Sequence, residues 1–231
     1  MAAAFLQSKS TSTDSSLNTA TAIILTNNIV VGNKVVGYCF WNNSSDDLTQ
    51  VKDNLGNANA TIVDTVSNGD IQKSFWFDVS VGGACTITLT TSTAHGFRGM
   101  VAHEVSGLNA GAPDQHKLID LAAPGTGTDA ITTSPNVTTT ADGEYIFGAV
   151  HVNNVLVMTV TQGTNFTDRE SIDGTAAVSP LESEDLIQST QGGISVTFTE
   201  NSSQQCAPCI MTFKASAGTA DTSTPYLNMM F

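Results

Sequence analysis

The chain consists of short runs of β-branched and aromatic residues that are separated by turn signals. The runs in its first half are "ATAIILT" at 20–26, "KVVGYCFW" at 34–41, "KSFWFDVSV" at 73–81 and "CTITLTT" at 85–91. Residues of these kinds favour strands. Pairs such as Gly32-Asn33 and Gly82-Gly83 favour tight turns, and such pairs recur too often to leave room for long helices. The sequence therefore predicts an all-β protein.

The second half of the chain continues this pattern. Its strand-like runs cover 99–108, 144–152, 155–163, 194–200 and 209–216, which brings the total to at least nine. The segment "SPLESEDLIQ" at 179–188 suits a short helical turn, because a Ser-Pro start and early acidic residues are typical of a helix N-terminus. An acidic loop is the alternative for this segment. At least nine short strands with little helix predict an antiparallel β-sandwich that is jelly-roll-like.

The length of 231 residues is typical of one large β-domain. Residues 8–19 are rich in Ser and Thr, so a flexible N-terminal arm is expected over residues 1–18. A single β-sandwich domain is expected over residues 19–216, followed by a C-terminal tail over 217–231. The tail ends in "TPYLNMMF", which is apolar enough to dock on a neighbouring protein.

The charge balance excludes several classes of partner. Acidic residues outnumber basic residues by 21 to 8, and the formal net charge is −13. Such a surface repels phosphate, so neither nucleic acid nor an anionic membrane is an expected partner. No run reaches the roughly 18 apolar residues that a membrane-spanning helix requires. The excess acid can serve solubility, bind cations or complement a basic partner, and solubility is the favoured interpretation.

One acidic turn raises the question of a metal site. Asp53-Asn54-Leu55-Gly56-Asn57 places several oxygen ligands close together, and Asp46-Asp47 lies a few residues earlier. The turn lacks the alternating ligands and the terminal Glu of a calcium-binding loop. Asn and Asp beside Gly are also what a tight turn requires. We therefore favour a hairpin turn here, with a weak calcium site as the alternative.

The segment "HEVSG" at 103–107 brings together residue types that are common in active sites. Neighbouring residues of a strand point to opposite faces, however, so His103 and Glu104 cannot act on one site. Glu104 and Glu144 would make a glycosidase pair only at a set separation, which the sequence does not supply. The four histidines share no metal-ligand spacing. We expect no enzymatic activity, no catalytic residue, no bound metal and no cofactor.

The cysteines and aromatic residues favour structural roles. "CAPC" at 206–209 has the spacing of a redox motif, but a strand-like run follows it instead of a helix. Cys39 is expected to be buried, and the possible disulfide pairings stay open. The aromatic residues Trp41, Trp76, Phe40, Phe75 and Phe77 could stack against a sugar. Packing in the core is the favoured interpretation, because these residues lie in or beside alternating strands.

Several of these segments, in order, resemble a β-sandwich domain that is widespread in phage virion proteins and bacterial surface proteins. They are "GNKVVGYCFW", "LTQVKDNLGNANATI", "SFWFDVSVGGACTITLTT", "HEVSGL", "VTTTADGEYIFGAV", "SVTFTE" and "CIMTFKAS". Together they span about residues 19 to 216. The shared features are turns and core strands, so the resemblance implies an architecture and carries over no catalytic residue.

The resemblance implies a jelly-roll-like module of the kind found in capsid decoration or cement proteins, head fibres and tail fibres. We therefore expect a non-enzymatic structural protein on the virion surface that stabilises the shell by burying interfaces. Its expected partners are the major capsid protein or another virion protein, and further copies of itself in a homo-oligomer. The alternative is a carbohydrate-binding or adhesive module of a tail fibre or bacterial surface protein, with glycan contacts from loops such as 106–136.

Overall fold

The structure is a computed structural model that describes residues 2–121, 129–131, 136–153, 157–201 and 204–216. Within these residues all regular secondary structure is extended. The strands are β1 (Ala4–Ser12), β2 (Asn18–Ile24), β3 (Lys34–Trp41), β4 (Leu48–Asp53), β5 (Thr61–Ser67), β6 (Ile71–Asp78), β7 (Thr86–His95), β8 (Arg98–Ser106), β9 (Gln115–Leu118), β10 (Asp129–Ile131), β11 (Asn136–Thr138), β12 (Glu144–His151), β13 (Val160–Thr161), β14 (Thr167–Ile172), β15 (Leu181–Gln188), β16 (Gly193–Ser195), β17 (Phe198–Glu200) and β18 (Cys209–Phe213). None of the described residues forms a helix long and apolar enough to cross a membrane.

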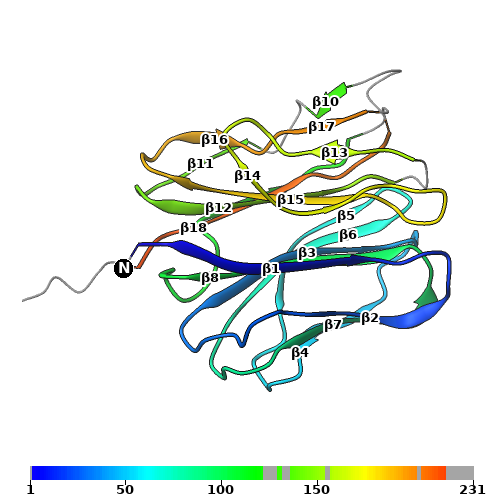
Figure 1. The fold of residues 1–231 in the computed structure, drawn as a ribbon, viewed down its shortest axis with the longest axis horizontal. Coiled ribbons are helices and arrows are strands. Elements are labelled where there is room, and N and C mark those ends of the chain that lie inside the picture. Colours follow the sequence, from blue (N-terminus) through cyan, green and yellow to red (C-terminus); the bar gives the residue numbers. More distant parts are fainter. Residues whose placement is uncertain (1, 122–128, 132–135, 154–156, 202–203, 217–231) are drawn as a thin grey trace, which may run out of the picture.

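The strands are stacked in four layers (Figure 1). The two inner layers are the five-stranded sheets β1-β8-β3-β6-β5 and β14-β15-β12-β18-β9. One outer layer is the sheet β2-β7-β4, and the other is formed by β10-β17-β13 together with β11-β16. All of these pairings are antiparallel. The expected antiparallel all-β sandwich is therefore confirmed.

Strands β1 to β8 form a complete jelly roll. In this fold the first strand pairs with the eighth, the eighth with the third and the third with the sixth, while the second, seventh and fourth strands form the facing sheet. The observed orders β1-β8-β3-β6 and β2-β7-β4 match this pattern. The fifth strand departs from it, because β5 pairs with β6 at the edge of the inner sheet.

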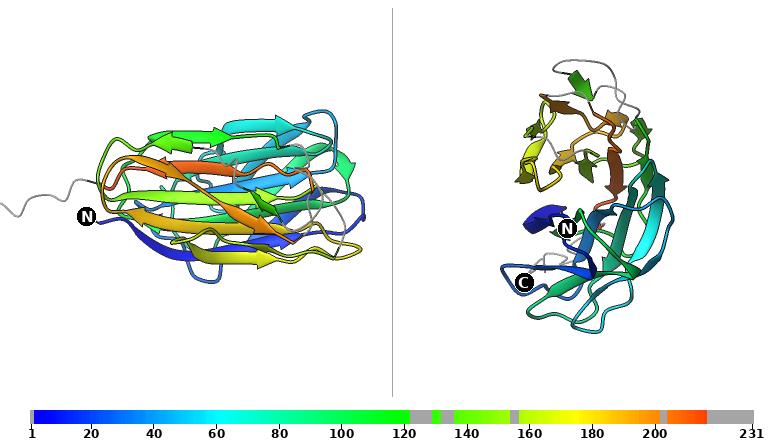
Figure 2. Two further views of the ribbon diagram at one scale, coloured as in Figure 1. Left: turned by 90° about the horizontal axis from the view of Figure 1, so that it is seen from above. Right: turned by 90° about the vertical axis from the view of Figure 1, so that its right-hand side faces the viewer.

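The same topology occurs a second time in β9 to β18. Here the inner sheet runs β9-β18-β12-β15-β14, in which β9 takes the place of the first strand and β18 that of the eighth. In the outer layer the second strand is divided into β10 and β11, and the seventh strand is divided into β16 and β17. The expectation was one sandwich over residues 19–216. The structure instead has two jelly rolls, the first of which already begins with β1 (Ala4–Ser12), and we call them the N-terminal and C-terminal sandwiches (Figure 2).

The two inner sheets pack face to face with an approximate two-fold relation. β3 packs on β12, the third strand on the third, while β1 packs on β14 and β5 packs on β9. The first strand of each sandwich thus packs on the fifth strand of the other, which is the pattern of an isologous interface between two copies. A β-bulge lies at the same place in β5 and β14, after Ile62 and Asp168 respectively. The chain is therefore built as a covalently joined pair of jelly rolls.

Each sandwich has its own apolar core, and a third core joins them. The N-terminal core includes Trp41, Phe75 and Leu89, and the C-terminal core includes Ile146 and Phe198. The core between the two inner sheets contains Val36, Tyr38 and Phe40 of β3 opposite Tyr145, Phe147 and Ala149 of β12. Alternate residues of β3 and β12 thus serve two cores, which explains why both strands are buried along their whole length.

Two sequence-based expectations are corrected by these strands. Residues 1–18 were expected to form a flexible arm, but Ala4–Ser12 pair along their length with β8 as strand β1. Their Ser and Thr side chains reach the other sandwich, where Ser8 and Ser10 donate hydrogen bonds to Glu170. Residues 179–188 were expected to form a helical turn or a loop, but Leu181–Gln188 form the inner strand β15. The expected tail at 217–231 lies outside the described residues.

Candidate functional site

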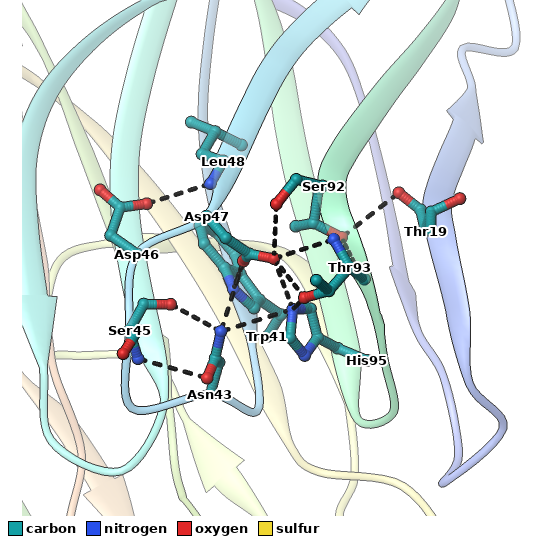
Figure 3. A network of polar contacts seen from close by, with 11 residues as sticks. Thr19, Trp41, Asn43, Ser45, Asp46, Asp47, Leu48, Ser92, Thr93 and His95 are labelled. Carbon is teal, nitrogen blue, oxygen red and sulfur yellow. Dashed lines mark hydrogen bonds and ion pairs between the residues drawn. The ribbon is translucent and has the colours of Figure 1, made fainter.

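A dense cluster of hydrogen bonds centres on Asp47, in the loop between β3 and β4 (Figure 3). Its Oδ1 accepts a hydrogen bond from Trp41 Nε1 at 3.0 Å. Its Oδ2 accepts one from the backbone N–H of Thr93 at 3.0 Å and lies 2.9 Å from His95 Nε2. Ser92 Oγ adds a longer contact at 3.3 Å. The carboxylate therefore joins the loop to the end of β7.

Asp47, His95 and Thr93 are the residue types of a nucleophile-activating triad, but their arrangement differs. Thr93 Oγ1 and Asp47 Oδ2 both meet the same nitrogen of His95, Nε2, at 2.9 Å each. A triad needs the carboxylate at one ring nitrogen and the hydroxyl at the other. Burial acts to raise the pKa of Asp47, but hydrogen bonds from Thr93 and His95 outweigh it and hold that pKa well below its usual range. The geometry is that of a structural clamp.

We expect Asp47→Ala to lower the free energy of unfolding by about 3 kcal/mol, because Trp41, Thr93 and His95 lose a charged acceptor. Since the folded pKa is depressed, this stabilisation is present above the ordinary value of 3.8 and is lost as the pH falls below it. Urea unfolding at neutral and acidic pH measures both effects. Ser44→Ala, on the exposed part of the same loop, is the control. A variant as stable as the wild type at neutral pH would contradict the clamp.

The Asp53 turn closes on itself. Asp53 Oδ1 accepts hydrogen bonds from the backbone N–H groups of Leu55, Gly56 and Asn57 at 3.1, 3.1 and 3.2 Å. Asn57 also fixes the turn to Ser80, because its Oδ1 accepts a hydrogen bond from the Ser80 N–H at 2.8 Å. Gly56 has a φ of +91°, which favours glycine. The geometry is that of a tight turn, as favoured from the sequence, but the turn does not close a hairpin, because β4 pairs with β7 and β5 pairs with β6 in another sheet.

The three aspartates considered for calcium serve separate purposes. Asp46 pairs with Lys73 at 2.6 Å, Asp47 holds its own cluster and Asp53 holds its turn. Over the described residues, no group of three or more His, Cys, Asp or Glu side chains is arranged to hold a metal ion.

His103 and Glu104 point to opposite sides of β8, as expected of neighbours in a strand. His103 lies between the sandwiches, with Tyr145 Oη 2.9 Å from Nδ1 and Ser183 Oγ 2.9 Å from Nε2. Burial lowers the pKa of His103 to about 3, so the ring is neutral at pH 7. Glu104 accepts hydrogen bonds from Gln7, Asn33 and the Val30 N–H. Both side chains are used to hold strands together.

Two further histidines also bridge the sandwiches. His151 Nε2 lies 2.9 Å from Asp70 Oδ2, and the ring stacks on Phe40 with 3.5 Å between centroids. His116 of β9 lies 3.0 Å from Asp64 Oδ2 of β5. The sequence analysis found no shared spacing among the histidines, and the structure supplies the reason. His103, His116 and His151 make separate polar contacts between the sandwiches, and His95 belongs to the Asp47 cluster.

The remaining candidate residues are also engaged or buried. Glu144 accepts hydrogen bonds from the N–H groups of Thr140 and Ala141 at the start of β12, far along the chain from Glu104. All four cysteines are buried free thiols. Burial raises the pKa of Cys206 to about 12, so the thiol of this "CAPC" residue is unreactive at neutral pH. The structure therefore gives this motif no redox arrangement.

The aromatic residues lie in the cores. The side chains of Trp41, Phe40, Phe75 and Phe77 are buried, which confirms core packing. Trp76 is half-buried between the sandwiches, with Lys34 Nζ 4.1 Å from the centre of its ring. These five residues therefore do not form an exposed platform for a sugar.

Sequence reasoning missed a pair of buried carboxyl groups inside the C-terminal sandwich. Glu182 and Glu184 of β15 are buried on the side opposite the inter-sandwich core. Glu184 accepts a hydrogen bond from the Gly163 N–H at 2.6 Å, and neither oxygen of Glu182 has a hydrogen bond of normal geometry. Burial raises the pKa of Glu182 to about 9 and that of Glu184 to about 8. Both groups are therefore protonated at pH 7 and behave as neutral core residues.

A shallow polar hollow of about 250 Å³ lies beside the connection between the sandwiches. Asn109, Pro113 and Phe213 line it together with Asp114 and Lys214. The two charged groups pair with each other at 2.7 Å, which ties the connection to the end of β18. The hollow thus marks a joint of the fold.

Four of the eight exposed large apolar side chains among the described residues lie in one segment. Residues 15–33 contain no charged residue, and we call them the uncharged segment. They include Leu17, Ile24, Val30 and Val31, which are 72%, 68%, 55% and 62% exposed. Exposed apolar surface of this kind is typical of sites where proteins bind one another. The best candidate for a functional site is therefore a surface and not a cleft.

No protein-family model and no curated protein sequence matches this chain. The resemblance to phage virion and bacterial surface proteins stays a prediction from the sequence. What the structure adds is the coarser statement that the chain is an antiparallel all-β fold of two stacked jelly rolls.

Proposed function

We propose that the chain is a non-enzymatic structural protein of a virus particle, a decoration or cement protein that binds the outside of the shell. The observation that carries this proposal is the contrast between its polar and apolar groups. The polar side chains of every candidate motif are used to hold loops, strands or sandwiches together, whereas apolar side chains of the uncharged segment face solvent. A protein of this kind acts by burying surface against neighbours.

The architecture supports the same role. A jelly roll is a fold of viral capsid proteins and of lectins, and two of them joined face to face make a rigid block with three cores. The net charge of −13 makes copies of the protein repel one another in solution, so that they associate only through a specific binding surface. The major shell protein and further copies of this chain are the proposed partners.

Quantitative mass spectrometry of purified virus particles tests the proposal. We expect this chain in a fixed simple ratio to the major shell protein, because a decoration protein follows the symmetry of the shell. A few copies per particle would contradict the decoration role and place the protein in a tail or fibre. Absence from the particles would overturn the virion role and favour the carbohydrate-binding alternative, which glycan-binding assays test.

A further inference from the structure

The strand β2 is a sheet edge whose own sequence offers no protection. It ends the three-stranded sheet β2-β7-β4 and pairs only with β7 among the described strands. Free edges carry unpaired N–H and C=O groups that attract other strands, and proteins usually protect them with charged residues or proline. β2 has the sequence NTATAII, which contains neither.

The other long edges of the molecule are protected by charge. Among edge strands of at least four residues that the structure describes, β1 carries Lys9, β4 carries Lys52, β5 carries Asp64, β9 carries Lys117 and β14 carries Arg169. β2 alone carries no charged residue. In a chain of net charge −13 with 29 charged residues, 21 acidic and 8 basic, an uncharged edge within an uncharged segment is a specific feature of the surface.

The hydrogen-bonding direction along β2 can be read from its neighbour. The Leu25 N–H donates to the Cys85 carbonyl, and Ile23 lies opposite Ile87 in the same register. Because the direction alternates along an antiparallel strand, the N–H and C=O groups of Ile23 face β7, and those of Ala22 and Ile24 face away. The Ala20 carbonyl, which also faces away, accepts a hydrogen bond from Arg98 Nη2. The stretch around Ala22 and Ile24 is therefore free to pair with another strand.

We infer that β2 is the docking edge for a second copy of this chain, which pairs antiparallel to it across a two-fold axis. This pairing satisfies the outward backbone groups of both edges at once and joins the two outer sheets into one. Charge favours this edge over others for a second copy, because two acidic chains repel each other least where neither sequence carries charge. Ile24 of β2 has an exposed side chain, and so have Leu17 before the strand and Val30 and Val31 after it, all within the same uncharged segment.

The molecule already contains one approximately two-fold contact, which joins sheet faces and not strand edges. Its two jelly rolls meet in an isologous arrangement between their inner sheets, so the fold tolerates two-fold packing without steric conflict there. The inferred pairing joins two such blocks through an outer sheet. It rests on the proposed function for its use, since a dimer on a shell binds with two attachment points and gains avidity.

The test measures the mass of the purified chain by light scattering after size exclusion, from about 1 to about 100 µM, since assembly depends on concentration. We expect the wild type to reach about twice the chain mass of 24.1 kDa. Ile24→Lys should hold the chain at the monomer mass, because each edge then presents a like charge to the other. Ile187→Lys, which places lysine on a different exposed apolar residue, should leave the dimer intact.

Ala22→Pro separates strand pairing from simple apolar contact. Its N–H faces away from β7, so proline removes no bond within the sheet but removes a donor from the free edge. We expect a folded monomer by circular dichroism and light scattering. A wild-type chain that stays monomeric throughout, or dimers that survive both Ile24→Lys and Ala22→Pro, would overturn the inference.

The outcomes also separate this inference from the proposed function. A dimer that requires β2, in a protein absent from virus particles, would support the interface and refute the virion role. A protein that is present in many copies on particles, but monomeric in solution and unaffected on particles by Ile24→Lys, would refute the pairing alone.

Discussion

Gly37→Ala is expected to lower the free energy of unfolding by about 3 kcal/mol, because overpacking a closed core forces backbone shifts. Gly37 lies at the centre of β3, and a Cβ there would lie 2.5 Å from the carbonyl oxygen of Val101 and closer still to the ring of Phe75. The ring could move only within a core that is already filled, and the carbonyl belongs to the neighbouring strand β8. Urea unfolding followed by circular dichroism measures the loss.

Gly193→Ala is the matched control for Gly37→Ala. Gly193 also lies in a strand, β16, but a Cβ built there meets no atom within 4 Å. We expect its free energy of unfolding to stay within about 0.5 kcal/mol of the wild type. Equal effects of the two substitutions would show that β3 is not the tightly packed centre of the N-terminal sandwich.

The free energy of unfolding is expected to fall by about 3 kcal/mol or more between pH 6 and pH 9, because Glu182 and Glu184 are ionised in the unfolded chain while burial keeps them protonated in the fold. Burial raises their pKa values from 4.5 to about 9 and about 8. A group with a raised folded pKa stabilises the fold below its unfolded pKa, and this contribution is lost as the pH rises through the folded pKa. The window of the loss is therefore 4.5 to about 9.

The double variant Glu182→Gln with Glu184→Gln should remove most of this slope, because glutamine stays neutral at every pH. Unfolding midpoints in urea between pH 6 and pH 9 measure it, and the part of the slope below pH 8 excludes the buried thiols, which ionise in the unfolded chain near their ordinary pKa of 9.0. Asp173→Asn removes one exposed carboxylate and should keep the wild-type slope. A double variant with an unchanged slope would mean that other groups cause the pH dependence.

The strands and turns of this chain could be predicted because they depend on local residue types. The run "KVVGYCFW" is β3 almost residue for residue, and the Asp53 turn has the Asn and Gly residues that its backbone needs. The burial of Trp41 and Phe75 followed from their place in alternating strands. The face that each side chain of β8 presents, with His103 on one side and Glu104 on the other, followed from the period of two.

The doubling of the jelly roll was not predictable, because the strand order of the two sandwiches repeats while their amino-acid sequences hardly resemble each other. The traces left are two glycines five residues apart at each of these strands, with Gly32 before β3 and Gly37 within it, and Gly143 before β12 and Gly148 within it. Strand β15 was hidden because Glu182 and Glu184 are neutral only once buried, a state that the isolated sequence does not display.

Strand β1 was missed for a related reason. A Ser and Thr-rich segment is typical of a disordered arm, and only the pairing with β8 and the acceptors supplied by Glu170 make it a strand. Its partners lie about a hundred residues or more away along the chain, beyond the reach of local patterns.

The position of β8 between β1 and β3 determines when the N-terminal sandwich can fold during synthesis of the chain. The N-terminal sandwich cannot close its inner sheet until residue 106 has left the ribosome, since β1 has no other partner strand in that sheet. Once it closes, Val36, Tyr38 and Phe40 face water until β12 and β18 have been made. The nascent chain therefore carries a sticky apolar face while the next hundred or so residues are translated, and that interval is when the chain most needs protection by chaperones.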